Sequence, residues 1–178
     1  ARWTATYRIY TVTCDGNGGT PSQSSSSFYY NEALGTLPTV TRTGYTFKGW
    51  STSANGPVNV STTTKVTGDV TYYAIWQINS YTLTVTAGTG GTVSGSGTYN
   101  YGATATLKAT PSAGYHFVKW SDGNTNASRT VTVTGNATYT ATFEQDPYLN
   151  LDKTSLTFEA AGGTQTVKVT SNVNWTVS

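Results

Sequence analysis

Apolar and polar residues alternate one by one along several short stretches of the chain. In residues 81–86, 130–134 and 138–143, apolar residues take every second position and threonines take the positions between them. Successive side chains of a β-strand point to opposite faces, so this period of two predicts strands with an apolar inner face and a threonine-covered outer face. The pattern therefore predicts a protein that is mainly β.

Turn and loop signals separate the predicted strands. Residues 122–123 (Asp-Gly) and 55–56 (Asn-Gly) predict tight turns, because these pairs tolerate the backbone of short hairpin connections. Residues 31–37 predict a turn or two of helix, which Pro38 would end. The four serines of residues 24–27 predict a low-complexity loop.

Three sequence segments occur twice in the chain, in the same order. The pairs are residues 10–20 and 81–92, residues 44–51 (GYTFKGWS) and 114–121 (GYHFVKWS), and residues 68–76 and 135–143. Self-similarity of this kind predicts tandem modules of one fold. Residues 3–7 (WTATY) resemble the closing strand of a further repeat upstream.

The aromatic residues of the repeated segments are predicted to form the module cores. Tyr45 and Phe47 lie two apart and so share one strand face. Gly44 and Gly114 are expected to let the backbone turn into this strand without a steric clash. Each buried ring contributes about 2–3 kcal/mol. The predicted core anchors are Tyr45, Phe47, Trp50, Trp76, Tyr115, Phe117, Trp120 and Phe143.

Residues 10–77 resemble the Listeria–Bacteroides repeat, the B-repeat family of internalin-like proteins. Residues 81–144 resemble a divergent form of the same repeat, and residues 1–9 then read as the closing strand of a preceding copy. The segments that carry the resemblance are residues 10–19, 44–50 and 71–76 in the first module and 114–117 and 120–123 in the second. The resemblance implies small β-grasp-like modules in tandem.

Residues 148–178 resemble the opening of a BACON domain, a Bacteroidetes-associated module often suggested to bind carbohydrate. The matching segments are LTF at 156–158, GGTQTVKV at 162–169 and TSN at 170–172, with Trp175. The resemblance implies a partial Ig-like β-sandwich, with about three of the roughly seven strands that such a fold needs. Together the resemblances imply a secreted or cell-surface protein from the Bacteroidetes.

Charge and apolar content narrow the possible partners. The ten basic and eight acidic residues are scattered singly, so the basic stripe that nucleic acid requires is not predicted. No apolar run approaches the roughly 20 residues of a transmembrane segment. Cys14 has no cysteine partner within the chain and is expected to be a small buried thiol. An intermolecular link or a reactive thiol is the alternative.

Catalytic and metal chemistry find little support in the sequence. His116 is the single histidine and is expected on the strand face opposite Tyr115 and Phe117. Glu144 and Asp146 are close in sequence but are expected in a linker rather than across a cleft. Residues 15–18 resemble a calcium loop only weakly, because the glutamate that such a loop needs at its twelfth position is replaced by serine. No catalytic, cofactor-binding or metal-binding residue is predicted.

Two functional hypotheses follow. The first is a non-catalytic structural stalk or adhesin segment of a secreted or surface-displayed protein, in which short linkers at residues 77–80 and 145–147 space neighbouring modules. The alternative is an array of carbohydrate-binding modules attached to a glycan-processing surface protein. Its candidate stacking rings are Tyr29, Tyr30, Tyr99, Tyr101 and Trp175. The expected partners are host or dietary glycans, surface proteins and neighbouring modules of the same protein.

Overall fold

The computed structural model describes residues 7–157, 160 and 162–176, and every regular element in these ranges is a β-strand. The predicted mainly β fold is therefore confirmed. The part of the predicted upstream strand that falls on residues 1–6 lies outside the described residues, as does Phe158 of the third module. Ile9, the last residue assigned to that strand, already belongs to the first strand of the first repeat.

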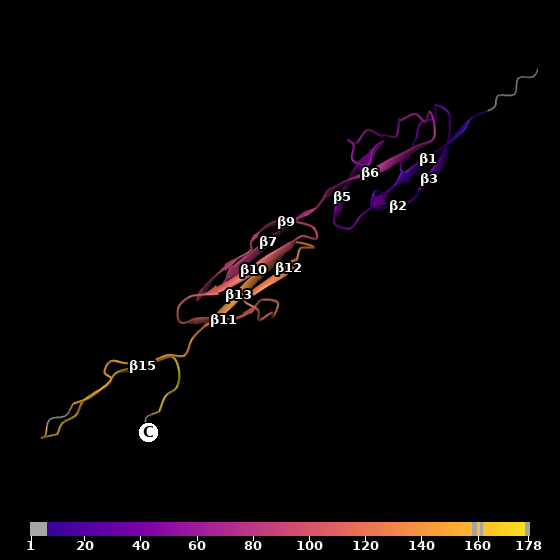
Figure 1. The fold of residues 1–178 in the computed structure, drawn as a ribbon. Coiled ribbons are helices and arrows are strands. Elements are labelled where there is room, and N and C mark those ends of the chain that lie inside the picture. The colour runs from indigo at the N-terminus through magenta and orange to yellow at the C-terminus, as the bar shows by residue number, and fades with distance from the viewer. Residues whose placement is uncertain (1–6, 158–159, 161, 177–178) are drawn as a thin grey trace, which may run out of the picture. The chain divides into compact units, whose positions relative to one another are not determined.

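The first repeat is built on one mixed four-stranded sheet (Figure 1). Its strands are β1 (Ile9–Asp15), β3 (Ser25–Tyr29), β5 (Tyr45–Ser51) and β6 (Val70–Ile78), in the order β3-β1-β6-β5. The first and last strands, β1 and β6, are central neighbours and run parallel, whereas both outer pairs are antiparallel. The short strands β2 (Thr20–Pro21) and β4 (Val40–Thr41) form a separate antiparallel pair.

The second repeat reproduces this strand order. Its four-stranded sheet has the order β11-β13-β7-β9 and is formed by β7 (Ser80–Ala87), β9 (Gly97–Asn100), β11 (Tyr115–Trp120) and β13 (Ala137–Gln145). A second sheet, β12-β10-β8, contains β8 (Gly91–Ser94), β10 (Thr104–Pro111) and β12 (Ser128–Thr132). The duplication seen in the sequence is thus a duplication of sheet topology.

The described residues divide into two compact units. The first contains the residues up to Leu83 together with Gly97–Ala105 and Val131–Ala137. The second contains Thr84–Ser96, Thr106–Thr130 and the residues from Thr138 onward. The part of the second repeat around Tyr81 and Tyr101 therefore belongs to the same unit as the first repeat.

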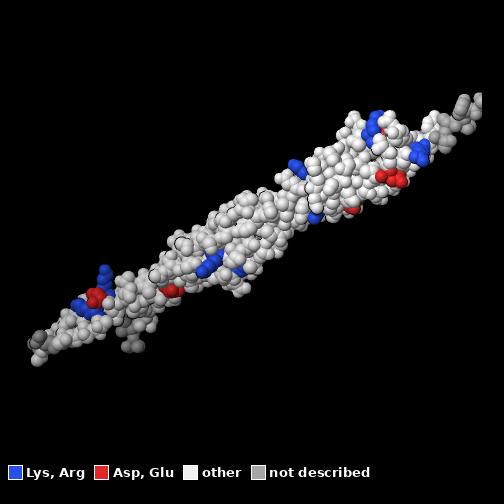
Figure 2. Space-filling model, turned by 45° about the horizontal axis from the view of Figure 1, so that its top comes forward, with Lys and Arg blue, Asp and Glu red and all other residues white. Residues whose placement is uncertain are grey.

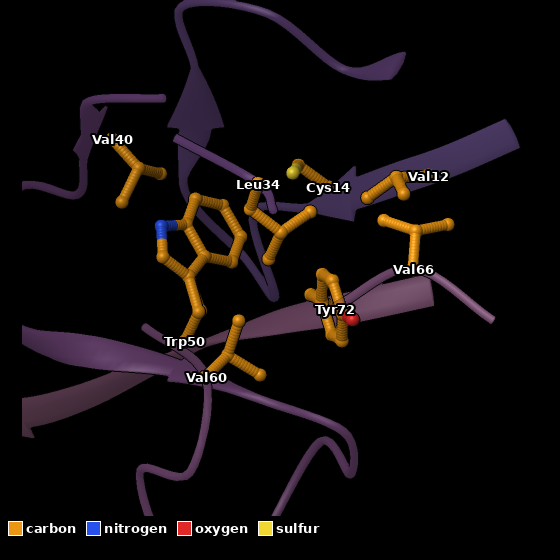
Figure 3. Packing of buried hydrophobic residues seen from close by; sticks show 9 residues of the cluster. Val12, Cys14, Leu34, Val40, Trp50, Val60, Val66 and Tyr72 are labelled. Carbon is orange, nitrogen blue, oxygen red and sulfur yellow. The ribbon is translucent and has the colours of Figure 1, made fainter. Parts of the chain in front are cut away.

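Alternation along the strands places their apolar side chains in the cores. In β10, Ala105, Leu107 and Ala109 are buried while the residues between them are exposed. The core of the first repeat surrounds Trp50, which is 2% exposed (Figure 3). Its other members are Val12, Cys14, Leu34, Val40, Val60, Val66, Tyr72 and Ala74.

A β-bulge occurs at the same point of both repeats. In β5 the register shifts between Phe47 and Gly49, and in β11 it shifts between Phe117 and Lys119. Residues three apart on a regular strand face opposite sides, but one extra residue returns them to the same side. The bulge therefore allows Phe47 to pack against Trp50, with ring centroids 5.6 Å apart. Phe117 and Trp120 repeat this contact at 5.6 Å.

Two local predictions in the first repeat are wrong. Residues 31–37 do not form a helix, because they are held extended against residues 62–66. The N–H of Leu34 donates to the carbonyl of Thr64, and Ala33 forms an antiparallel bridge with Lys65. Asn31 and Gly35 both have φ of +64°, which a right-handed helix excludes. The predicted serine loop is also a strand, since residues 25–27 belong to β3 and pair with β1.

The predicted linkers are shorter than expected. Strand β6 continues through Ile78 and β7 begins at Ser80, so Asn79 alone separates the two strands. Strand β13 continues through Gln145, which places Glu144 in a strand rather than in a linker. After Pro147, β14 (Leu149–Leu151) pairs in antiparallel fashion with β15 (Val169–Ser171).

The predicted turns are present and the repeated glycines have a specific geometry. The N–H of Gly123 donates to the carbonyl of Trp120, and the N–H of Gly56 donates to the carbonyl of Ser53. Gly44 has φ of +78° and is the third residue of the turn that leads into β5. This backbone angle matches a type II turn, in which glycine is favoured at the third position.

Candidate binding surfaces

Exposed tyrosines gather at the start of the first repeat. Tyr7, Tyr29 and Tyr30 are 72%, 51% and 61% exposed. Tyr29 packs against Tyr7 at 5.5 Å with an interplanar angle of 64°, and Tyr30 packs against Tyr10 at 6.3 Å and 55°. The rings in each pair are therefore inclined to one another and do not form the flat platform on which a sugar would stack.

A hollow of about 660 Å³ opens beside these rings. Its lining combines three tyrosine rings with one guanidinium group and one threonine hydroxyl. The residues are Tyr7, Arg8, Tyr10, Tyr30 and Thr67. Such a surface offers both ring faces and hydrogen-bond donors to whatever occupies it.

The candidate rings of the second repeat are more enclosed. Tyr99 and Tyr101 are half-buried, and Tyr101 packs against Tyr81 at 6.4 Å with an interplanar angle of 61°. The ring of Tyr101 also covers Gly44, because a Cβ atom placed on Gly44 would lie 1.9 Å from Cδ1 of Tyr101. Tyr101 is therefore engaged by the first repeat rather than open to a ligand.

Asn79 fixes this contact through three hydrogen bonds within the first compact unit. Its N–H donates to the carbonyl of Gly44 at 2.9 Å, and its carbonyl accepts from the N–H of Tyr101 at 2.8 Å. Its side-chain oxygen accepts from the hydroxyl of Thr46 at 2.6 Å. Asn79, the single residue between β6 and β7, is therefore hydrogen-bonded to Gly44, Thr46 and Tyr101.

Trp175 lies at a separate apolar surface in the third module. It is 47% exposed and lines a hollow of about 400 Å³. The remaining lining residues are Leu149, Leu151, Val167, Val169 and Thr176. The ring therefore faces aliphatic side chains of β14 and β15 and their surroundings.

The predicted core anchors differ in their degree of burial. Trp120 is 0% exposed, and Trp50 and Phe143 are also buried. The other anchors are half-buried, namely Tyr45, Phe47, Trp76, Tyr115 and Phe117. Trp76 donates its indole N–H to the carbonyl of Gly16, and Trp120 donates its own to the carbonyl of Asn126. Each indole therefore anchors a loop as well as filling space.

Directly before its closing strand, each repeat has a hydrogen-bond acceptor that was not predicted from the sequence, a carboxylate in the first repeat and an amide in the second. Oδ1 of Asp69 accepts from the N–H of Thr11 at 2.7 Å, and Oδ1 of Asn136 accepts from the N–H of Thr82 at 2.8 Å. The recurring Gly-Asp and Gly-Asn pairs were the available signal. In the first repeat this bond continues the contact between β1 and β6 beyond the Val12–Val70 pair.

The residues of the weak calcium-loop resemblance hold a turn. Oδ1 of Asp15 accepts from the N–H of Asn17, and the side-chain amide of Asn17 donates to the carbonyls of Ala54 and Ala74. Within the described ranges, no three side chains of the metal-binding types gather into a possible metal site. The Asp15 carboxylate and the Asn17 amide are thus both engaged in bonds to the protein itself.

Two ion pairs occur among the described residues. Nδ1 of His116 lies 2.9 Å from Oδ1 of Asp146, and both side chains are about half exposed. The guanidinium of Arg129 binds Asp122 at 2.6 Å, and this hydrogen bond holds the pKa of the carboxyl below its ordinary value. Figure 2 shows basic and acidic side chains dispersed over the visible face without a continuous patch of one sign.

Comparisons with known proteins agree with the tandem organisation. Residues 10–75 match the family model of the Listeria-Bacteroides repeat domain, and residues 81–147 match that of the divergent InlB B-repeat domain. The matches to these two families therefore follow one another in the chain. The BACON-like assignment of residues 148–178 stays a prediction.

One curated protein, from Evansella cellulosilytica, carries a name that describes a Gly-rich membrane protein. It is 30% identical to the chain over 167 residues, which cover 90% of this chain and 18% of that protein. The chain thus spans less than a fifth of this relative. No solved structure matches the chain significantly. Among the described residues, no helix is long and apolar enough to cross a membrane.

Proposed function

We propose that the chain is a non-catalytic segment of a surface-displayed protein, in which repeats act as a load-bearing stalk between functional parts. In this proposal the two repeats are β-grasp-like modules and residues 148–178 begin an Ig-like module. The tandem family matches support a repeat array. The name of the Evansella cellulosilytica relative supports an association with the cell surface.

The parallel pairing of β1 and β6 is the observation that carries the proposal. Force applied through the chain pulls the start of β1 and the end of β6 in opposite directions. Because these strands are parallel neighbours, the force acts along them and loads their hydrogen bonds together. The pairs that share the load run from Val12–Val70 to Asp15–Tyr73. An arrangement of this kind resists tension better than one in which hydrogen bonds open one after another.

Single-molecule pulling tests this proposal by comparing the unfolding force of the first repeat in two pulling geometries. In the first arrangement the handles are at the two chain ends. In the second they are attached through cysteines at positions 45 and 78 in a Cys14→Ala background. Tyr45 and Ile78 face each other at one end of the antiparallel β5–β6 pair, so pulling there opens the bonds in sequence.

The first repeat is expected to unfold at a markedly higher force from the chain ends than from positions 45 and 78. Its unfolding event is recognised by the chain length it releases, at most about 3.6 Å per residue. Equal forces in the two geometries would contradict a load-bearing role. The Cys14→Ala protein pulled from its ends controls for the loss of the buried thiol.

A carbohydrate-binding role is the alternative proposal, and the single exposed ring of Tyr29 near the hollow at Arg8 favours it, because one ring face is enough to stack on a sugar. Isothermal titration with a panel of oligosaccharides tests it. Binding that is lost in Tyr29→Ala and kept in Tyr99→Ala would support this role, because Tyr99 is half-buried in the second repeat. Absence of binding across the panel would leave the stalk as the better proposal.

A further inference from the structure

The two repeats present the same ring pair at their starting ends. The Tyr10–Tyr30 rings lie 6.3 Å apart at 55°, and the Tyr81–Tyr101 rings lie 6.4 Å apart at 61°. The backbone around them agrees as well. The N–H of Tyr30 donates to the carbonyl of Arg8, as the N–H of Tyr101 donates to that of Asn79. Tyr30 and Tyr101 are therefore structural equivalents.

The repeats also share the glycine turn at their other ends. Gly44 and Gly114 have φ of +78° and +75°, and both precede the tyrosine that begins a strand. The carbonyl of Gly44 accepts from the N–H of Asn79 at 2.9 Å, and that of Gly114 accepts from the N–H of Asp146 at 2.8 Å. Each repeat thus carries a ring at one end and a glycine turn at the other.

In the first compact unit, the ring of one repeat covers the glycine of the other. Tyr101 approaches Gly44 so closely that only a residue without Cβ fits between them. At Gly114 a Cβ atom would have no neighbour within 4 Å. The equivalent ring of the first repeat is open as well, since Tyr30 is 61% exposed beside the hollow and the adjacent Ile9 is 63% exposed.

We propose that Tyr30 and the hollow beside it form a docking site for the glycine turn of another repeat of this type. The occupant would be joined to the chain through Tyr7 and Arg8, as the first repeat is joined to the second through Ile78 and Asn79. Arg8 can make both backbone hydrogen bonds that Asn79 makes, because those bonds use only the main chain. The inference rests on the proposed function only in treating the repeats as units of an array.

The chemistry of the site fits this occupant better than a sugar. The inclined Tyr10 and Tyr30 rings reproduce the pair that already receives a glycine turn in the same molecule. A turn with glycine exposes bare backbone, on which an aromatic face can pack closely. Docking would cover the apolar surface of Tyr30 and Ile9, which otherwise stays in contact with water.

An extended protein provides the test. A second copy of residues 10–77 is placed directly before Tyr7, in place of residues 1–6, so that Tyr7 and Arg8 occupy the positions of Ile78 and Asn79. Nitration of exposed tyrosines with tetranitromethane, followed by peptide mass spectrometry, measures the accessibility of Tyr30. We expect nitration of Tyr30 to fall several-fold in the extended protein, to the level of Tyr101.

A glycine substitution separates docking from an unrelated shielding effect. Changing the glycine of the added copy that corresponds to Gly44 to alanine is expected to restore nitration of Tyr30 to its parent level. Gly114→Ala is the matched control, since it places the same strain at nearly the same φ but has no neighbouring ring. This control shows whether the turn itself tolerates the substitution.

Equal nitration of Tyr30 in the parent and extended proteins would overturn the inference. Protection of Tyr30 in the parent by an oligosaccharide, without protection in the extended protein, would assign the ring to carbohydrate binding instead. Neither result depends on the unfolding force of the first repeat. Failure of the docking site and failure of the load-bearing role are therefore distinguishable.

Discussion

Glycine packs directly beneath an aromatic ring at the same point of both repeats. A Cβ atom on Gly19 would lie 2.4 Å from the indole of Trp76, and one on Gly91 would lie 2.3 Å from the ring of Phe143. Neither glycine has a positive φ, so the requirement comes from space and not from backbone conformation. This explains why a Gly-Gly-Thr segment recurs in two otherwise divergent sequences.

Gly91→Ala is expected to destabilise the second repeat by about 1–3 kcal/mol, because the added methyl group must displace the ring of Phe143. Gly135→Ala is the control, since its Cβ would meet no neighbour within 4 Å and its φ is not positive. Urea unfolding of the two variants measures the difference in the free energy of unfolding. Equal stability of both variants would show that the space beneath Phe143 can adjust.

Cys14 is the only cysteine and lies in the core of the first repeat, 6% exposed. Burial raises the pKa of its thiol, which lowers the fraction present as the reactive thiolate at a given pH. Both effects act against a role as a reactive thiol in the folded protein. The same burial makes Cys14 a natural reporter of the first repeat.

We expect Cys14 to react with a disulfide reagent such as DTNB at least about 100-fold more slowly in the native protein at pH 8 than in urea, because reaction requires an opening that costs several kcal/mol. The absorbance of the released thiolate measures both rates. A native rate within a few-fold of the unfolded rate would show that the thiol is accessible and would support the alternative of an intermolecular link.

At the scale of the elements, the bulge decides which side chains enter the core. Phe117 and Trp120 lie three apart in sequence, so on a strand in which every residue was paired they would face opposite sides of the sheet. Trp120 is 0% exposed, so its displacement would remove the largest side chain from the core of the second repeat. The bulge is therefore as important as the residue types around it.

Deletion of Val118 is expected to leave the second repeat folded, because it removes the unpaired residue and leaves Phe117 and Trp120 two apart on the same strand face. Val118→Ala keeps the bulge and is expected to cost about 1 kcal/mol, because Val118 is only half-buried. Near-ultraviolet circular dichroism and thermal unfolding compare the two variants. An unfolded deletion variant would show that the extra residue does more than bring Phe117 and Trp120 to the same face.

The sequence predicted several strands but not the features that depend on distant residues. Alternation was sufficient for β7 and β13, where it placed apolar side chains on one face and threonines on the other. The bulges break this alternation and have no clear local signal. Local preference predicts a helix over residues 31–37, but backbone hydrogen bonds to residues 62–66 hold them extended. Tertiary pairing thus overrides local preference there.

The candidate rings illustrate the same limit. The sequence predicts both Tyr30 and Tyr101 as ligand-binding residues and contains no local difference that distinguishes them. Tyr101 is covered because Gly44 lies beneath it, whereas Tyr30 is open. The difference depends on which segment packs against each ring, and Gly44, which packs against Tyr101, is far from it in the sequence.

At the scale of the whole molecule, the repeats combine separate cores with short connections. Each core has its own central tryptophan, Trp50 or Trp120. Asn79 is the only residue between the last strand of the first repeat and the first strand of the second. In arrays of this kind, stability is approximately the sum of the stability of each repeat and a nearest-neighbour contribution.

The two tryptophans permit a direct test of this independence, with Cys14 as the reporter. Trp50→Ala removes the centre of the core that contains Cys14 and should cost about 3–5 kcal/mol, a large share of the stability of so small a module. Reaction of Cys14 with DTNB should then approach the unfolded rate. Trp120→Ala should unfold the second repeat by the same argument. The rate at which Cys14 reacts with DTNB should nevertheless stay within about tenfold of the parent rate. The reason is that the first repeat loses only the nearest-neighbour contribution of about 1 kcal/mol around Tyr101 and Gly44. If Trp120→Ala accelerated the reaction as much as Trp50→Ala, the two repeats would unfold as one cooperative unit, and the contact at Asn79 would be as strong as the cores that it connects.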